Sequence, residues 1–163
     1  MTHWRLCDPV HDPRRTALMM RRALRQFAGR RQPMTAAPEV LSELQGLRVR
    51  VPHLTGALVA SKDGLVIAHV VGDVEPDGLA ALTAAALGVG ARLTEAVGHG
   101  GFRELLVSGE RGYVATYAAG TSCVLTLLAS AEANVGRLNL EARRTGPRIA
   151  ALVEGTLERQ ARP

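Results

Sequence analysis

Aromatic residues are scarce in this chain of 163 residues, in which phenylalanine, tyrosine and tryptophan together make up 3%. Pockets for small organic ligands are usually lined by aromatic and aliphatic side chains with a few polar groups, so the sequence has little from which to build one. Hydrophobic residues still account for 47% of the chain. That share suits one globular domain whose core consists mainly of Leu, Val and Ala.

Cysteine, lysine and long apolar runs are scarce as well. The two cysteines, Cys7 and Cys123, lie far apart in the sequence, which argues against a disulfide framework and fits a reducing compartment. No uninterrupted apolar run approaches the ~20 residues of a membrane span, and the N-terminus has no signal-like stretch. We therefore expect a cytoplasmic protein without stable membrane insertion. Lys62 is the only lysine among 20 basic residues, a bias typical of a high-GC bacterial genome.

Motifs for catalysis and nucleotide binding are missing too. No glycine-rich loop leads from a strand into a helix with a following lysine, which argues against a phosphate-binding loop. No Gly-x-Ser-x-Gly elbow occurs, Ser108 falls at a strand end, and Cys123 lies in an apolar run where an inert core thiol is expected. The sequence predicts no catalytic residue and no cofactor, so we expect a protein that is not an enzyme.

One group of residues near the N-terminus has side chains that could bind a metal ion. His3, Cys7 and His11 follow one another at intervals of four, which would align them on a helix. Pro9 and Pro13 interrupt any such helix, so no metal site is predicted. The remaining histidines are expected to be structural: His53, His69 and His99.

The net charge of +5 is unevenly distributed. Residues 1–33 carry eight arginines against two aspartates, a balance of +6, which leaves −1 for residues 34–163. The nearly neutral body is no argument for nucleic-acid binding. The sequence therefore suggests a basic extension, 1–33, followed by a domain, 34–163. An amphipathic pattern in the extension fits an anionic membrane surface or an acidic partner; alternatively Met34 is the true start, or the extension is a loose tail.

Apolar periodicity and turn residues predict the order α-β-β-α-β-β-β-α, an α/β (α+β) fold with a five-stranded antiparallel sheet between helix layers. A polar tetrad that ends in Asp63-Gly64 predicts a tight turn between the first two strands. Gly146-Pro147 is expected to kink or split the last helix. The expected elements are a helix at 38–51, a hairpin within 55–71, a long helix from Pro76, strands at 102–109, 112–119 and 122–130, and a helix from around Asn134.

The long helix after Pro76 has two unlike faces. One is a stripe of larger side chains that predicts the core-facing side: Leu82, Ala86, Val89, Leu93 and Val97. The opposite flank has mostly small residues: Ala80, Ala84, Gly88, Ala91 and Glu95. Such a flank favours the close approach of another helix; alternatively, an alanine-rich composition simply fills an exposed face.

Three segments together resemble the bacterial roadblock (dynein light-chain type) domains: GALVASKDGLVIAH, FRELLVSGERGYVATYAAG and ANVGRLNLEARR. The resemblance covers 37–158 and implies a roadblock, profilin-like fold. It further implies a homodimer in which the middle strands pair about a twofold axis and the second helices pack side by side. The contact residues it implies are Ala80, Ala84, Gly88, Ala91, Phe102, Glu104 and Leu106.

The same resemblance implies a role. Such domains commonly work beside a small Ras-like GTPase, often with a histidine-kinase-like sensor, and the helix platform of the dimer would contact the GTPase switch surface. Arg92 and Arg103 are possible contacts, and no arginine finger is assigned. We therefore expect a non-catalytic homodimeric regulator or scaffold for such a GTPase in bacterial signal transduction, with no nucleic-acid partner. The alternative is a small-molecule-sensing module.

Overall fold

The computed structural model describes residues 37–161. The chain divides into two units, Met1–Gln32 and Pro33–Pro163, and the described residues all belong to the second. The metal set and the basic extension considered above lie outside the described residues. The architecture is therefore that of the second unit alone.

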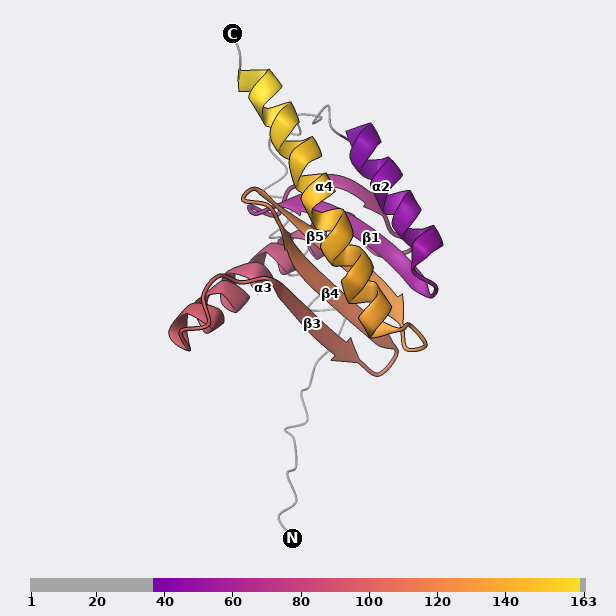
Figure 1. Ribbon diagram of the computed structural model, residues 1–163. Coiled ribbons are helices and arrows are strands. Elements are labelled where there is room, and N and C mark those ends of the chain that lie inside the picture. Colours follow the sequence, from indigo (N-terminus) through magenta and orange to yellow (C-terminus); the bar gives the residue numbers. More distant parts are fainter. Residues whose placement is uncertain (1–36, 162–163) are drawn as a thin grey trace, which may run out of the picture. The chain divides into compact units, whose positions relative to one another are not determined.

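Eight elements follow one another in the predicted order (Figure 1). The strands form one antiparallel sheet with the order β2-β1-β5-β4-β3, so that β2 and β3 are its edges. The predicted fold class is thereby confirmed. The elements are α2 (Ala37–Arg50), β1 (Leu54–Ser61), β2 (Val66–Val70), α3 (Pro76–Ala96), β3 (Glu104–Gly109), β4 (Gly112–Ala119), β5 (Cys123–Ser130) and α4 (Val135–Ala161).

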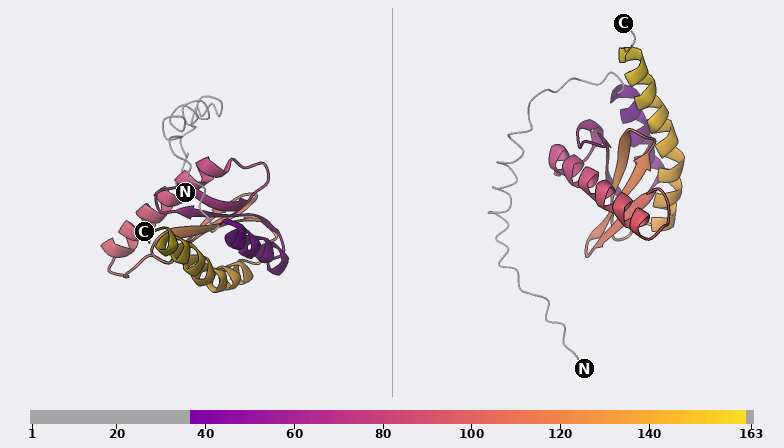
Figure 2. Two further views of the ribbon diagram at one scale, coloured as in Figure 1. Left: turned by 90° about the horizontal axis from the view of Figure 1, so that it is seen from above. Right: turned by 90° about the vertical axis from the view of Figure 1, so that its left-hand side faces the viewer.

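Helices cover both faces of the sheet (Figure 2). On one face α2 packs on β1 and β2, and α4 packs on β4 and β5. On the other face α3 crosses the sheet and contacts all five strands. Both faces of the central strands are therefore buried, which explains why β1 and β5 read as nearly continuous apolar runs.

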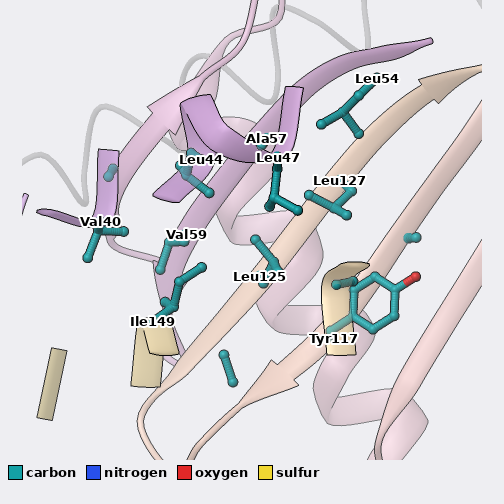
Figure 3. Packing of buried hydrophobic residues seen from close by; sticks show 14 of the residues in the cluster. Val40, Leu44, Leu47, Leu54, Ala57, Val59, Tyr117, Leu125, Leu127 and Ile149 are labelled. Atoms are coloured by element: carbon teal, nitrogen blue, oxygen red, sulfur yellow. The ribbon is translucent and has the colours of Figure 1, made fainter. Parts of the chain in front are cut away.

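The main core lies between the sheet and the α2–α4 layer (Figure 3). Val40, Leu44 and Leu47 recur along α2 at helical spacing, and all three are fully buried. They meet alternate residues of the sheet, including Leu125 and Leu127 of β5, which are also fully buried. This layer therefore holds most of the large apolar side chains that fold the domain.

The layer between α3 and the sheet is much thinner. Its buried apolar cluster consists of Leu58, Ala60 and Ala80, with partly buried neighbours around it. Where α3 packs on the sheet, its other buried residues are Thr83 and Gly90. Small side chains let the helix lie close to the sheet, but they bury little apolar area, so α3 gains less hydrophobic stabilisation than α2 or α4.

The hairpin turn between β1 and β2 rests against this helix. Gly64 has a φ of 81°, and a Cβ there would lie 3.1 Å from the Cα of Ala81 in α3. The Ser61 amide donates to the Leu65 carbonyl at 2.8 Å, which closes the turn. Glycine is required by both the backbone angle and the close approach, so the turn belongs to the framework of the fold.

The last helix differs from expectation. The sequence predicted a kink or a split at Gly146-Pro147; the split is absent, because α4 runs through Pro147 as one helix, and the kink stays a prediction. Proline clashes with the Cβ of the residue before it when that residue is helical, but Gly146 has no Cβ. Pro147 itself is exposed. The helix begins as predicted, since Asn134 caps it by accepting a hydrogen bond from the Arg137 amide at 2.9 Å.

Candidate protein interface

The larger side chains of the stripe that was assigned to the core are exposed, so the predicted core face of α3 was wrong. The side that meets the sheet includes Ala80, which is fully buried, and Thr83, which is 3% exposed, and Leu79 packs against the same buried cluster. Both faces of the helix are apolar, and its periodicity cannot tell which one the sheet covers. The exposed fractions are 56% for Leu82, 59% for Val89, 60% for Leu93 and 61% for Val97.

The neighbouring edge strand is also exposed and apolar. Strand β3 pairs with β4 on one side only, so its outer backbone groups have no strand partner among residues 37–161. Leu106 is 42% exposed and Val107 is 52% exposed. We use the name α3–β3 surface for Leu82, Val89, Leu93, Val97, Leu106 and Val107. Leu106 and Val107 are consecutive in the strand, so their side chains point to opposite faces of the sheet. Exposed large apolar side chains on a helix and on a neighbouring sheet edge mark this region as a candidate interface.

The predicted contact residues do not share one exposed face. Ala80 is fully buried within its own subunit, which leaves it no surface for a partner. Gly88 is exposed, whereas Ala84, Ala91, Phe102 and Glu104 are half-buried, and Leu106 belongs to the α3–β3 surface. The stripe that the sequence pattern assigned to the core contains four of the exposed residues: Leu82, Val89, Leu93 and Val97.

Phe102 holds the corner between α3 and β3. Its ring lies against Gly90, because a Cβ added at Gly90 would fall 2.3 Å from the ring atom Cε2 of Phe102. A mid-helix glycine costs about 1 kcal/mol relative to alanine. Here the missing side chain makes room for the ring, which explains the glycine inside the helix.

We expect Gly90→Ala to destabilise the protein, because the new methyl group must displace the Phe102 ring. The loss should be about 1–3 kcal/mol, the range for overpacked sites. Urea unfolding followed by circular dichroism measures it. Gly88→Ala is the matched control: no atom lies within 4 Å of its added Cβ, so it should stabilise by up to about 1 kcal/mol. Equal effects of the two substitutions would contradict the assigned role of Gly90.

An ion pair links the start of β3 to α4. Arg143 donates to both carboxylate oxygens of Glu104, at 2.9 Å from Nε and 2.7 Å from Nη2. These hydrogen bonds lower the pKa of Glu104, although partial burial acts in the opposite direction. On the adjacent strand Tyr117 is 4% exposed, and burial together with the nearby Glu104 charge raises its pKa to about 12. Its hydroxyl donates to Oδ1 of Asn139.

The other charged contacts tie the two helices of the opposite layer together. Arg50 of α2 donates to Glu141 of α4 at 3.0 Å and to Thr145 at 3.2 Å. Arg137 of α4 caps the end of α2 by donating to the Arg50 carbonyl at 2.7 Å. These pairs account for the charges between the helices as structural contacts and require no ligand.

Other residues with reactive or charged side chains make structural contacts. Cys123 is fully buried as predicted, its thiol donates to the Ala119 carbonyl, and burial raises its pKa to about 11. Glu75 caps α3 by accepting hydrogen bonds from the amides of Asp77 and Gly78. No group of three or more possible metal ligands occurs between residues 37 and 161.

One open hollow lies beside the candidate interface, at the end of α3. Its lining residues are Ala91, Glu95, Gly98, Gly100, Gly101 and Phe102. The hollow is wide open to solvent and contains one aromatic ring. It lacks the enclosed apolar lining and convergent polar groups that bind small molecules.

By length and composition alone, α3 would also pass as a membrane span, and it is the one described helix that does. Two observations favour a protein interface instead. The helix packs on the sheet through Ala80, Thr83 and Gly90, and it carries the charged residues Arg92 and Glu95 near its end. A helix with one face on a sheet cannot present an apolar surface all round to lipid.

Comparisons with known proteins agree with this architecture. A family model described as Roadblock/LC7 domain matches residues 40–129. The uncharacterized protein MJ0714 of Methanocaldococcus jannaschii is 31% identical over 104 residues, which cover 63% of this chain and 87% of that protein.

Two solved structures are similar as well. The gliding protein mglB of Thermus thermophilus is 27% identical with a TM-score of 0.62, covering 77% of this chain and 94% of that one. A Roadblock/LC7 domain from Streptomyces avermitilis is also 27% identical, with a TM-score of 0.58, covering 75% of this chain and 98% of that one.

Proposed function

Because the chain belongs to the Roadblock/LC7 domain family, we propose that it is a non-catalytic, self-associating regulator or scaffold of a small Ras-like GTPase in bacterial signalling. The observation that carries the proposal is the exposed α3–β3 surface. Three of its side chains are more than half exposed on α3, Val97 follows directly at the end of the helix, and two more lie on the adjacent edge strand. A surface of this kind serves binding to another protein.

A second copy of the chain fits this surface. Pairing of β3 with its mate would satisfy the outer backbone groups of the edge strand, which otherwise invite uncontrolled pairing. A twofold axis at β3 would place the same apolar patch of both copies together, as an isologous interface requires. Self-association would thereby cover both parts of the α3–β3 surface at once.

The end of α3 supports the same arrangement. Beyond Gly90 the helix has few contacts with its own sheet, and Arg92, Leu93, Glu95 and Ala96 are all exposed. Figure 1 shows these last turns extending past the β3 edge of the sheet. A sheet continued by a partner copy would lie beneath them, and the exposed apolar side chains would then be covered.

The GTPase partner is inferred from the family and from no contact in the structure. A small-molecule sensor is the weaker alternative, because the hollow beside Phe102 is open and shallow. A cytoplasmic location and a histidine-kinase-like sensor upstream complete the proposed pathway. The catalytic residues would belong to the GTPase, whose switch segments the dimer would bias.

State-dependent capture tests this function. The purified protein is immobilised and offered the small Ras-like GTPases of the same genome, each loaded with GDP or with a non-hydrolysable GTP analogue. We expect one GTPase to bind about tenfold more tightly in one nucleotide state, because a regulator can bias a switch only through differential affinity. Equal affinity for both states would contradict regulation, and the absence of any capture would contradict the GTPase partner.

A further inference from the structure

Glu104 occupies the first position of the edge strand, where the resemblance implied a direct contact with the partner subunit. In the structure its carboxylate already accepts two hydrogen bonds from Arg143 of the same chain. The side chain of Glu104 is 28% exposed, and that of Arg143 is 65% exposed. Both carboxylate oxygens of Glu104 are therefore engaged within the subunit.

The surroundings of this pair show what it holds. Glu104 is paired across the strands with Tyr117, whose hydroxyl binds Asn139. Asn139 and Arg143 are separated by four residues on α4, so their side chains lie on the same face of that helix. The start of β3 and the neighbouring part of β4 are thus tied to two successive turns of α4.

Two other contacts lie next to the start of the edge strand: the Phe102 ring lies against Gly90 of α3, and the Ala118 amide of β4 donates to the Arg103 carbonyl at 3.0 Å. The backbone of β3 bonds to β4 on one side only, and the strand becomes more exposed after Leu105. Strands of this kind open locally with little free energy, so a charge-assisted bidentate contact at one end restricts them more than it would restrict a central strand. Arg103 is the other charged residue whose field acts on Glu104.

We propose that Arg143 is a positioning residue for self-association, which fixes the start of β3 by holding Glu104 within its own subunit, so that Glu104 does not contact the partner. The inference rests on the proposed function, because it assumes that β3 pairs with a second copy. Under this proposal, Glu104 influences association through a contact inside one subunit.

The test compares Arg143→Met with Arg144→Met in the full chain. Arg144 is the matched control, since it neighbours Arg143, is 64% exposed and pairs with Glu141 inside α4. Sedimentation equilibrium gives the dissociation constant in 0.05 M and 0.5 M NaCl, and hydrogen exchange gives the protection of amides 104–109. Circular dichroism confirms that each variant is folded.

We expect Arg143→Met to weaken association about fivefold at low salt and to speed exchange in β3. Raising NaCl from 0.05 M to 0.5 M should weaken the association of the wild type by a similar factor. The association of Arg143→Met should not depend on salt. The exchanged pair Glu104→Arg with Arg143→Glu should restore association. If Arg143 acted only through apolar packing, association would not depend on salt and the exchanged pair would not restore it.

Two results would overturn the inference: Arg143→Met behaving like Arg144→Met, or Glu104→Gln weakening association while Arg143→Met does not. The second would mean that Glu104 meets the partner directly. A wild-type protein that stays monomeric at tens of micromolar would instead contradict the proposed function. Unchanged exchange of amides 104–109 in the Arg143→Met monomer would then refute the positioning role separately.

Discussion

Leu93→Asp is expected to make the protein monomeric at concentrations where the wild type self-associates. The side chain is 60% exposed in the single subunit, so a carboxylate there remains hydrated and the fold tolerates it. Within a twofold interface the same carboxylate would be buried without a partner in both subunits. A loss of about 3 kcal/mol corresponds to association weakened by about 100-fold.

Sedimentation equilibrium of the two proteins measures this effect. Val49→Asp is the control, because Val49 is 85% exposed on α2, in the opposite helix layer. It introduces the same charge into a helix without touching the α3–β3 surface. If Leu93→Asp associates as tightly as Val49→Asp, the outer stripe of α3 is not the interface, and the account of self-association fails.

Leu125→Ala is expected to cost about 2–5 kcal/mol of the free energy of unfolding. Leu125 is fully buried in β5, the central strand of the sheet, and belongs to the main cluster between the sheet and the α2–α4 layer. The smaller side chain would leave a cavity that its neighbours on two helices and two adjacent strands cannot fill without moving. Urea unfolding gives the change directly.

Leu140→Ala is the matched control, since Leu140 is 50% exposed on the outer side of α4. It should change stability by less than about 1 kcal/mol, because surface substitutions away from special contacts have small effects. Similar losses for both variants would show that the buried layer around Leu125 does not dominate the stability of the domain.

The sequence pattern predicted the buried face correctly for a helix on one side of the sheet and wrongly for the helix on the other side. On α2, Val40, Leu44 and Leu47 alternate with polar residues, and the predicted core face is the observed one. On α3 both faces are apolar, and the pattern was assigned to the wrong side. The larger side chains, Leu82 and Leu93 among them, were expected in the core because size usually follows burial. They are exposed because the side of the helix that meets the sheet is a different one, on which Ala80, Thr83 and Gly90 are buried.

The pairing of Glu104 with Arg143 shows a second limit. The spacing of residues along β3 predicts which side chains lie at the edge, but it does not show what each one meets. Arg143 lies 39 residues further along the chain, on a helix whose register against the sheet depends on packing. The pairing of the two is therefore a product of the folded arrangement.

By itself, the sequence determined the number, type and order of the elements, the antiparallel sheet between helices, and the family, because local periodicity and turn residues act over short distances. Only the tertiary structure decided which face of α3 meets the sheet and which charged side chains pair between elements, as Glu104 of β3 does with Arg143 of α4. Those choices depend on the fit between layers: Ala80 is fully buried against the sheet, a side chain at Gly90 would collide with the Phe102 ring, and Leu82 and Leu93 lie on another side of the helix and remain exposed.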